Sequence, residues 1–229
     1  MNFLPGWDVG AFMAGGGPAF PEIMGTPAKT EDGTVAGSHN ANLPAGIVAG
    51  ETLVLVCYQV GSPSPAPSGW TLIVASSVYR LAAYQKLATG SEGSSVAVAF
   101  QSGFTDCFTA IAFRVKGAIM FAGAASADPN ATGPPDPPNL SPGWGTRKIL
   151  WISCGYAARS ASADVQIDGY PSGFTLAQTY AQTNGPSLIK QRLAIAGMND
   201  EVSSKNPPAF SSTPTSGGPG FVAATLAIA

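Results

Sequence analysis

Charged side chains are scarce in this sequence. The 11 Lys and Arg and the 13 Asp and Glu make up only 10% of the 229 residues, whereas an average soluble domain has roughly 25%. Apolar residues reach 45%, which excludes a chain kept disordered by high charge and low hydrophobicity. A surface with so few charges is poorly protected against association. We therefore expect the protein to assemble into a larger complex.

Long basic runs, long apolar runs and a leader-like beginning are also missing. No cluster of Lys and Arg offers the basic stripe that a nucleic-acid groove requires, and no apolar run reaches the ~18 residues that cross a bilayer. Residues 1–17 lack a basic start and contain Asp8, unlike a secretory signal peptide. We expect no nucleic-acid or membrane partner, and a protein that stays in the cytoplasm until it assembles.

Side chains that commonly carry catalysis are few. His39 is the only histidine, and no Gly-x-Ser-x-Gly turn supplies a nucleophile. We therefore expect His39 to be a polar residue of a loop or strand edge and not a catalytic base. The acidic residues fall mostly in turns, whereas a glycoside hydrolase needs two facing carboxylates at a defined separation. The sequence therefore predicts that the protein is not an enzyme.

Cysteine is rare, and its spacing does not suit disulfides or metal binding. Cys57, Cys107 and Cys154 are odd in number and each lies in an apolar run, which favours small buried hydrophobic residues. A metal site clusters Cys and His at ligand spacing, and neither 128–130 nor 164–168 has the alternating oxygen ligands of a calcium loop. We expect no metal and no cofactor.

What the sequence has in abundance is turn residues between short apolar runs. From Gly33 onward, many of the 28 glycines and 20 prolines punctuate the chain at the 8–12-residue spacing typical of a β-sandwich or barrel. No stretch has the apolar period of an amphipathic helix. The strands expected in the first half are 52–59, 69–76, 79–87, 95–100, 107–115 and 119–125.

The strand pattern occurs twice along the chain. Pro-Ser-Gly-aromatic-Thr-Leu is found at 67–72 and again at 171–176, and Arg-Leu-Ala at 80–82 and again at 192–194. An apolar run that contains a cysteine precedes both motifs in each half. The preserved order predicts a duplicated unit.

We therefore predict an all-β fold: a single jelly-roll-like antiparallel β-sandwich over residues 21–229. It is built from two degenerate repeats, about 42–127 and 139–229, because four strands cannot close a core alone but two facing sets can. The Pro-rich stretch 128–145 is expected to be an ordered connection across the middle of the domain. Residues 1–20 form an irregular N-terminal arm.

The arm is the segment that distinguishes this chain from a generic sandwich. It carries large apolar side chains, which usually dock on something. Either they bind a partner, or the arm folds back onto its own domain. The candidate partner-binding residues are Phe3, Leu4, Trp7, Phe12, Met13 and Phe20.

Several motifs resemble β-sandwich virion proteins of tailed bacteriophages and gene-transfer-agent-like particles. They are Asn-Leu-Pro-Ala-Gly-Ile at 42–47 with the following Leu-Val-Leu-Val, Pro-Ser-Gly-Trp-Thr-Leu at 67–72, and Asp-Pro-Pro at 136–138 with the following Pro-Gly-Trp-Gly. The resemblance covers about 26–229 and leaves out the arm. It implies a head-decoration or minor tail protein, and it offers no catalytic residues to carry over.

The expected function is that of a capsid decoration (cement) protein located in the virion. It binds the major capsid protein and neighbouring copies of itself, and it stabilises the head. The alternative is a minor tail or tail-fibre component that binds a host receptor or glycan through exposed aromatics such as Tyr170 or Tyr180. Trp70, Trp151 and Phe174 fit core positions better. A jelly-roll hydrolase would need paired carboxylates on one sheet.

Overall fold

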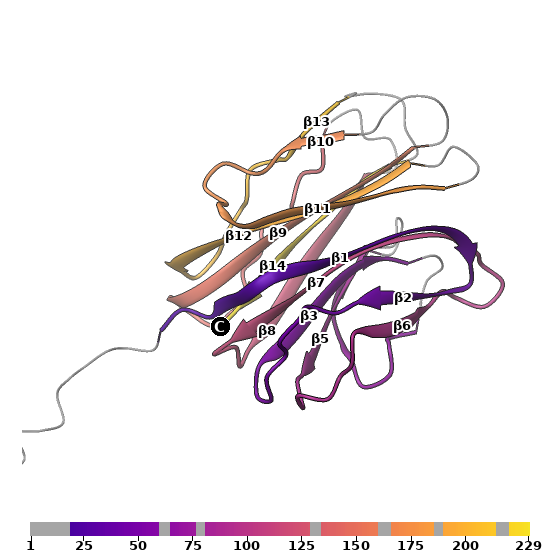
Figure 1. The fold of residues 1–229 in the computed structure, drawn as a ribbon. Helices are drawn as coiled ribbons and strands as arrows, with labels where there is room; N and C mark the ends of the chain where they lie inside the picture. Colours follow the sequence, from indigo (N-terminus) through magenta and orange to yellow (C-terminus); the bar gives the residue numbers. More distant parts are fainter. Residues whose placement is uncertain are drawn as a thin grey trace, which may run out of the picture.

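The computed structural model describes residues 19–59, 65–76, 81–128, 134–159, 166–185, 190–213 and 220–229. All regular elements of these ranges are β-strands, and the sheets are antiparallel. Two five-stranded sheets pack against each other (Figure 1). The all-β sandwich predicted from the sequence is confirmed.

Five strands form the first sheet, in the spatial order β1 (Glu22–Ala36), β7 (Asp106–Lys116), β3 (Thr52–Tyr58), β5 (Leu81–Leu87) and β4 (Thr71–Ala75). The central strand β3 is the continuous apolar run of the sequence, and every residue in it is buried. A strand that is apolar on both faces needs cover on both faces.

The second sheet has the order β11 (Leu176–Asn184), β12 (Lys190–Val202), β9 (Arg147–Arg159), β14 (Gly220–Ile228) and β8 (Phe121–Asp128). Its inner face meets the first sheet in one hydrophobic cluster. Tyr58 of β3 and Tyr156 of β9 stack there with ring centroids 5.0 Å apart. Because residues of both halves of the chain form this cluster, the two halves share one core.

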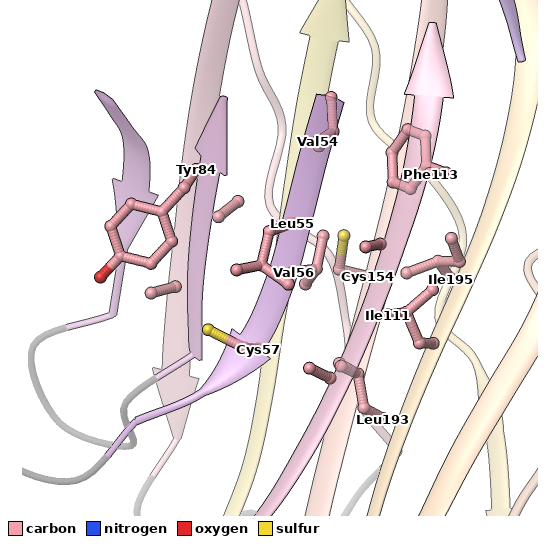
Figure 2. Close-up of a cluster of buried hydrophobic side chains, with 14 of the residues drawn as sticks. Val54, Leu55, Val56, Cys57, Tyr84, Ile111, Phe113, Cys154, Leu193 and Ile195 are labelled. Carbon is pink, nitrogen blue, oxygen red and sulfur yellow. The ribbon is translucent and has the colours of Figure 1, made fainter. Parts of the chain in front are cut away.

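Figure 2 shows that the side chains of β3 alternate between the two faces of the first sheet. Val56 points toward Cys154 and Ile111 in the space between the sheets, whereas Leu55 and Cys57 point to the side that carries Tyr84 (Figure 2). Successive side chains of a strand point to opposite faces. Both faces of this sheet are therefore packed.

Two short ribbons cover the outer faces. β2 (Ser38–Asn42) pairs with β6 (Ser95–Ala99) over the first sheet, where His39 stacks on Phe108 of β7 at 5.0 Å. β10 (Gln166–Gly169) pairs with β13 (Ser211–Thr213), and Ile167 packs with Ala157 and Ala194 of the second sheet. These layers explain why the core strands lack a polar face.

The edges of the sandwich are closed as well. At one side Gln182 N of β11 donates to Glu31 Oε1 of β1 at 2.9 Å. At the other side β8 approaches β4 so closely that a Cβ on Gly123 would lie 2.8 Å from Val74. Edge strands that face one another are not open templates for pairing with other chains.

The two sheets use their strands in the same order. Read from opposite edges, β1-β7-β3-β5-β4 corresponds to β8-β14-β9-β12-β11. The register pairs Tyr58 with Leu81 in the first sheet and Tyr156 with Leu193 in the second. This register matches Tyr58 with Tyr156, the last residues of the two cysteine-containing runs.

The hydrogen bonds of the connections correspond in the same way. Trp70 N donates to Pro67 O at 3.0 Å, and Phe174 N donates to Pro171 O at 3.1 Å. The two-repeat hypothesis stays a prediction, with which these bonds and the strand orders agree. The strand orders do not establish the jelly-roll connectivity.

Three sequence expectations need correction. β1 begins at Glu22, before the start expected at Gly33, because a half-exposed edge strand with bulges after Met24 and Asp32 tolerates polar residues, Gly and Pro. β8 pairs with β14 of the second sheet, although the sequence grouped it with the first repeat. His39, expected as a polar residue of a loop or strand edge, does lie on a strand of the two-stranded β2–β6 ribbon, but its side chain is buried.

Candidate interaction surface

The N-terminal arm leaves the sandwich at one identifiable end. Phe3, Leu4, Trp7, Phe12 and Met13 lie outside the residues that the structure describes.

Phe20, the last candidate residue of the arm, is described. It is half-buried, and Lys148 Nζ lies 5.6 Å from its ring centroid. Two residues later Glu22 pairs with Lys116, the last residue of β7. The arm therefore emerges beside the turn at 117–120 that follows β7.

This turn is fixed to the end of the chain and exposes an apolar side chain. Ile119 N and Met120 N both donate to Ala229 O, at 2.7 and 2.8 Å. Gly117 has a φ of 77°, which the reversal after β7 requires and which favours glycine. The result is that Ile119 is 83% exposed at a rigid position.

An open groove of about 450 Å³ lies between this turn and the ends of the first sheet. We call it the end groove. Leu87, at the last position of β5, is 67% exposed and lines the groove together with Ile119. The wall and floor include Thr52, Thr71, Gln85, Lys86, Ala118 and Phe121. The end groove therefore combines an apolar rim with one cation, that of Lys86.

Lys86 is held in place by the next turn. Its Nζ lies 3.6 Å from Glu92 Oε1. The Glu92 carboxylate accepts from Thr89 N at 2.6 Å and from Gly90 N at 3.0 Å, and these hydrogen bonds lower its pKa to about 2. Glu92 therefore stays ionised at neutral pH and fixes the turn beside the groove.

A second ion pair fixes the loop on the other side of this end. Arg114 Nη1 donates to Glu51 Oε2 at 3.1 Å and also to Gly46 O. Val48 N donates to the same Glu51 oxygen at 3.1 Å. The loop before β3 is thereby tied to β7, so the arm-bearing end presents preformed turns.

His39 lies in an enclosed cluster far from this surface. Its Nδ1 is 2.8 Å from Asp32 Oδ2, and its Nε2 is 2.9 Å from Asp106 O. Asp106 Oδ2 also accepts from Tyr58 OH at 2.8 Å. The hydrogen bond with His39 is the main cause of the lowered pKa of Asp32. The cluster joins β1, β2 and β7.

Tyr180 and Tyr170, the candidate glycan-stacking residues, differ in exposure. Tyr180 lies on β11, not in a loop, and is 46% exposed. Arg192 Cζ lies 4.6 Å from its ring centroid, and Arg192 is itself held by Gln182 Oε1 at 2.9 Å. Tyr170 is half-buried against Phe210. The guanidinium therefore already covers part of the Tyr180 ring.

The core assignments made from the sequence are confirmed. Trp70, Trp151 and Phe174 are buried. The three cysteines are unpaired and buried, and burial raises the pKa of each thiol, that of Cys107 to about 12.

Two other kinds of site are absent from the described ranges. Within them, no three His, Cys, Asp or Glu residues come together in a group that could hold a metal ion. Nor do they contain a helix with the length and apolar character needed to cross a membrane.

Comparison of the chain with protein-family models, with curated proteins and with solved structures finds no match.

Sequence reasoning missed the end groove. It placed Leu87 and Ile119 in apolar strands, where burial is the usual outcome. The available signal was position: Leu87 directly precedes Ala-Thr-Gly, and Ile119 follows Lys-Gly-Ala, so both lie next to turns. An apolar residue at a strand end has only part of its surface within reach of the core.

Proposed function

We propose that this protein is a non-enzymatic structural component of a bacteriophage virion, where it decorates the capsid as a cement protein. It binds the lattice of the major capsid protein together with neighbouring copies of itself, and it stabilises the head. The virion assignment rests on the resemblance of the motifs in 26–229 described above.

One observation carries the binding role. The apolar arm emerges at the end of the sandwich that also exposes Leu87 and Ile119. Burial of apolar area contributes about 25 cal/mol per Å², which offsets the ordering of an arm. Weak contacts that recur over a lattice add up through avidity. The low charge of the chain agrees with a surface that is covered on assembly.

Deletion of residues 1–17 tests this proposal. We expect the truncated protein to keep its β-sheet circular dichroism and thermal transition, because the described sandwich begins after the arm, and to lose binding to expanded capsids in a co-sedimentation assay. Full-length protein with Val35→Ser is the matched control, since Val35 is exposed at the opposite end of β1. Capsid coating by the truncated protein at wild-type affinity would overturn the anchoring role.

A minor tail or tail-fibre protein that binds a host receptor or glycan is the second candidate. The exposure of Tyr180 favours it, since exposed aromatic rings stack on sugars. A glycan array and a host-cell pull-down measure it directly. Binding that is lost in Tyr180→Ser but kept in the arm deletion would favour this function over capsid decoration.

A further inference from the structure

We infer that in the free protein the end groove is occupied by the apolar arm of the same chain, with Phe12 and Met13 packed against Leu87 and Ile119. This inference deepens the proposed function and rests on it for one point: that the arm is what binds the capsid. If it does, the groove covers these side chains until the protein meets the particle.

The groove needs an apolar occupant. Leu87 and Ile119 are 67% and 83% exposed, and both line the same open groove. Ala118 and Phe121 add to its apolar lining. The free energy gained by fully burying side chains of this kind is far larger than thermal energy. Binding of a tethered apolar segment in the groove is therefore favourable.

The arm has the length to reach it. In the first sheet β1 and β4 lie four strand positions apart, which is about 19 Å at ~4.8 Å per strand. The eight-residue step from Phe12 to Phe20 spans at most about 27 Å. Phe12 can therefore reach any part of the groove while Phe20 keeps its place beside Lys148.

The sequence of the arm also suits a return to the domain. Gly15, Gly16 and Gly17 stand between Met13 and Phe20, and glycine adopts the backbone conformations that a reversal needs. The one charged side chain in residues 1–20 is Asp8, and the charged side chain that lines the groove is that of Lys86. Opposite charges fix the orientation of a docked segment more than its affinity.

Tethering favours the chain's own arm over that of a second copy. A short flexible linker gives an effective concentration in the millimolar range, whereas a second copy competes only at its solution concentration. We therefore expect occupancy that is independent of protein concentration.

Disulfide trapping tests the contact in purified protein without any particle. In the double variant Phe12→Cys, Ile119→Cys, mild oxidation is expected to give a monomer with an internal disulfide, seen on a non-reducing gel and by mass. The native thiols do not interfere, because Cys57, Cys107 and Cys154 are buried and their pKa values are raised. A covalent dimer would show that another copy's arm fills the groove, and absence of any disulfide would show that the arm does not enter it. Either result overturns the inference.

The matched control is Phe12→Cys, Phe104→Cys. Phe104 is exposed beyond the other end of β7, a strand that spans roughly 36 Å at ~3.3 Å per residue. This separation exceeds the reach of the arm from Phe20. Trapping with equal yield in this control would mean that Phe20 leaves its place beside Lys148 and that the arm is not held at the end groove, which also overturns the inference.

Chymotrypsin cleavage after Phe12 provides a second readout. In the double variant Leu87→Glu, Ile119→Glu, we expect the arm to be cleaved about tenfold faster than in wild type. A tenfold change in rate corresponds to a small change in docking free energy. Val48→Glu is the control, since Val48 is exposed at the same end but does not line the groove. Equal cleavage rates in the double variant and in wild type, with unchanged thermal transitions, would overturn the inference. This result would not bear on capsid binding, which the deletion of residues 1–17 tests separately.

Discussion

At the scale of single residues, His39 shows how tertiary structure defines a side chain. The ring is buried between Phe108 and the ribbon, with Asp32 at one nitrogen and backbone oxygens of Ala36 and Asp106 at the other. Both ring nitrogens therefore have polar partners within hydrogen-bond distance. The residue thus ties the corner between β1 and β2 to β7, which gives it a structural role.

We predict that Asp32→Asn weakens the fold at pH 7 by less than about 1 kcal/mol, because the Asp32 side chain is partly exposed to solvent. The pKa of Asp32 is lowered in the folded state, chiefly by His39. Its contribution is therefore present above the unfolded pKa of about 3.9 and is lost as pH falls through the lower folded pKa. Denaturant unfolding should show a smaller gap between wild type and variant at pH 2 to 3 than at pH 7.

The control for this measurement is Glu201→Gln, which changes an exposed carboxyl on β12. We expect it to leave the pH dependence of unfolding close to that of wild type. An equal gap for Asp32→Asn at both pH values would contradict the role assigned to the hydrogen bond between Asp32 and His39.

At the scale of elements, the closed edges of the sandwich depend on two glycines. A Cβ on Gly33 of β1 would lie 2.9 Å from Asn184 O of β11, and a Cβ on Gly123 of β8 would lie 2.8 Å from Val74 of β4. These distances are below van der Waals contact. Each glycine lets an edge strand of one sheet approach an edge strand of the other.

We predict that Gly123→Ala destabilises the protein by about 1–3 kcal/mol, in the range of overpacked cores. Val74 is branched at Cβ and cannot rotate away cheaply, so β8 and β4 must separate. Chemical denaturation measures the loss. Ala124→Ser is the control, because Ala124 points to the other face of β8. A loss no larger than that of the control would contradict the close approach of these strands.

At the scale of the whole molecule, the two sheets meet at matched positions of the two halves. Tyr58 and Tyr156 occupy the same place in the register of each sheet and stack with an interplanar angle of 8°. Strand order, register and the two Pro-Ser-Gly turns agree with the two-repeat prediction.

A double-mutant cycle with Tyr58→Leu and Tyr156→Leu should give a coupling of about 0.5–1.5 kcal/mol, the usual value for an aromatic pair beyond area burial. The cycle cancels the separate loss of the Tyr58 hydrogen bond to Asp106. Tyr58→Leu with Phe174→Leu serves as the comparison, since Phe174 packs in a different cluster. Additivity in the tyrosine pair would contradict direct packing between the two sheets at this point.

The sequence by itself determined the fold class and much of the core. Apolar runs between Gly and Pro turns favour buried strands, so β3 and the burial of Cys57, Trp70 and Trp151 followed from pattern alone. Periodicity is a local property, and these features depend on local chemistry.

Tertiary structure alone decided which edges meet, where β1 begins and how His39 is enclosed, because each depends on groups distant in the chain. The same holds for the binding surface. The apolar arm is visible in the sequence, but only the fold brings Leu87 of β5 and Ile119 of the turn after β7 to the same groove. Contacts between residues so far apart carry no local sequence period, and only the folded chain brings them together.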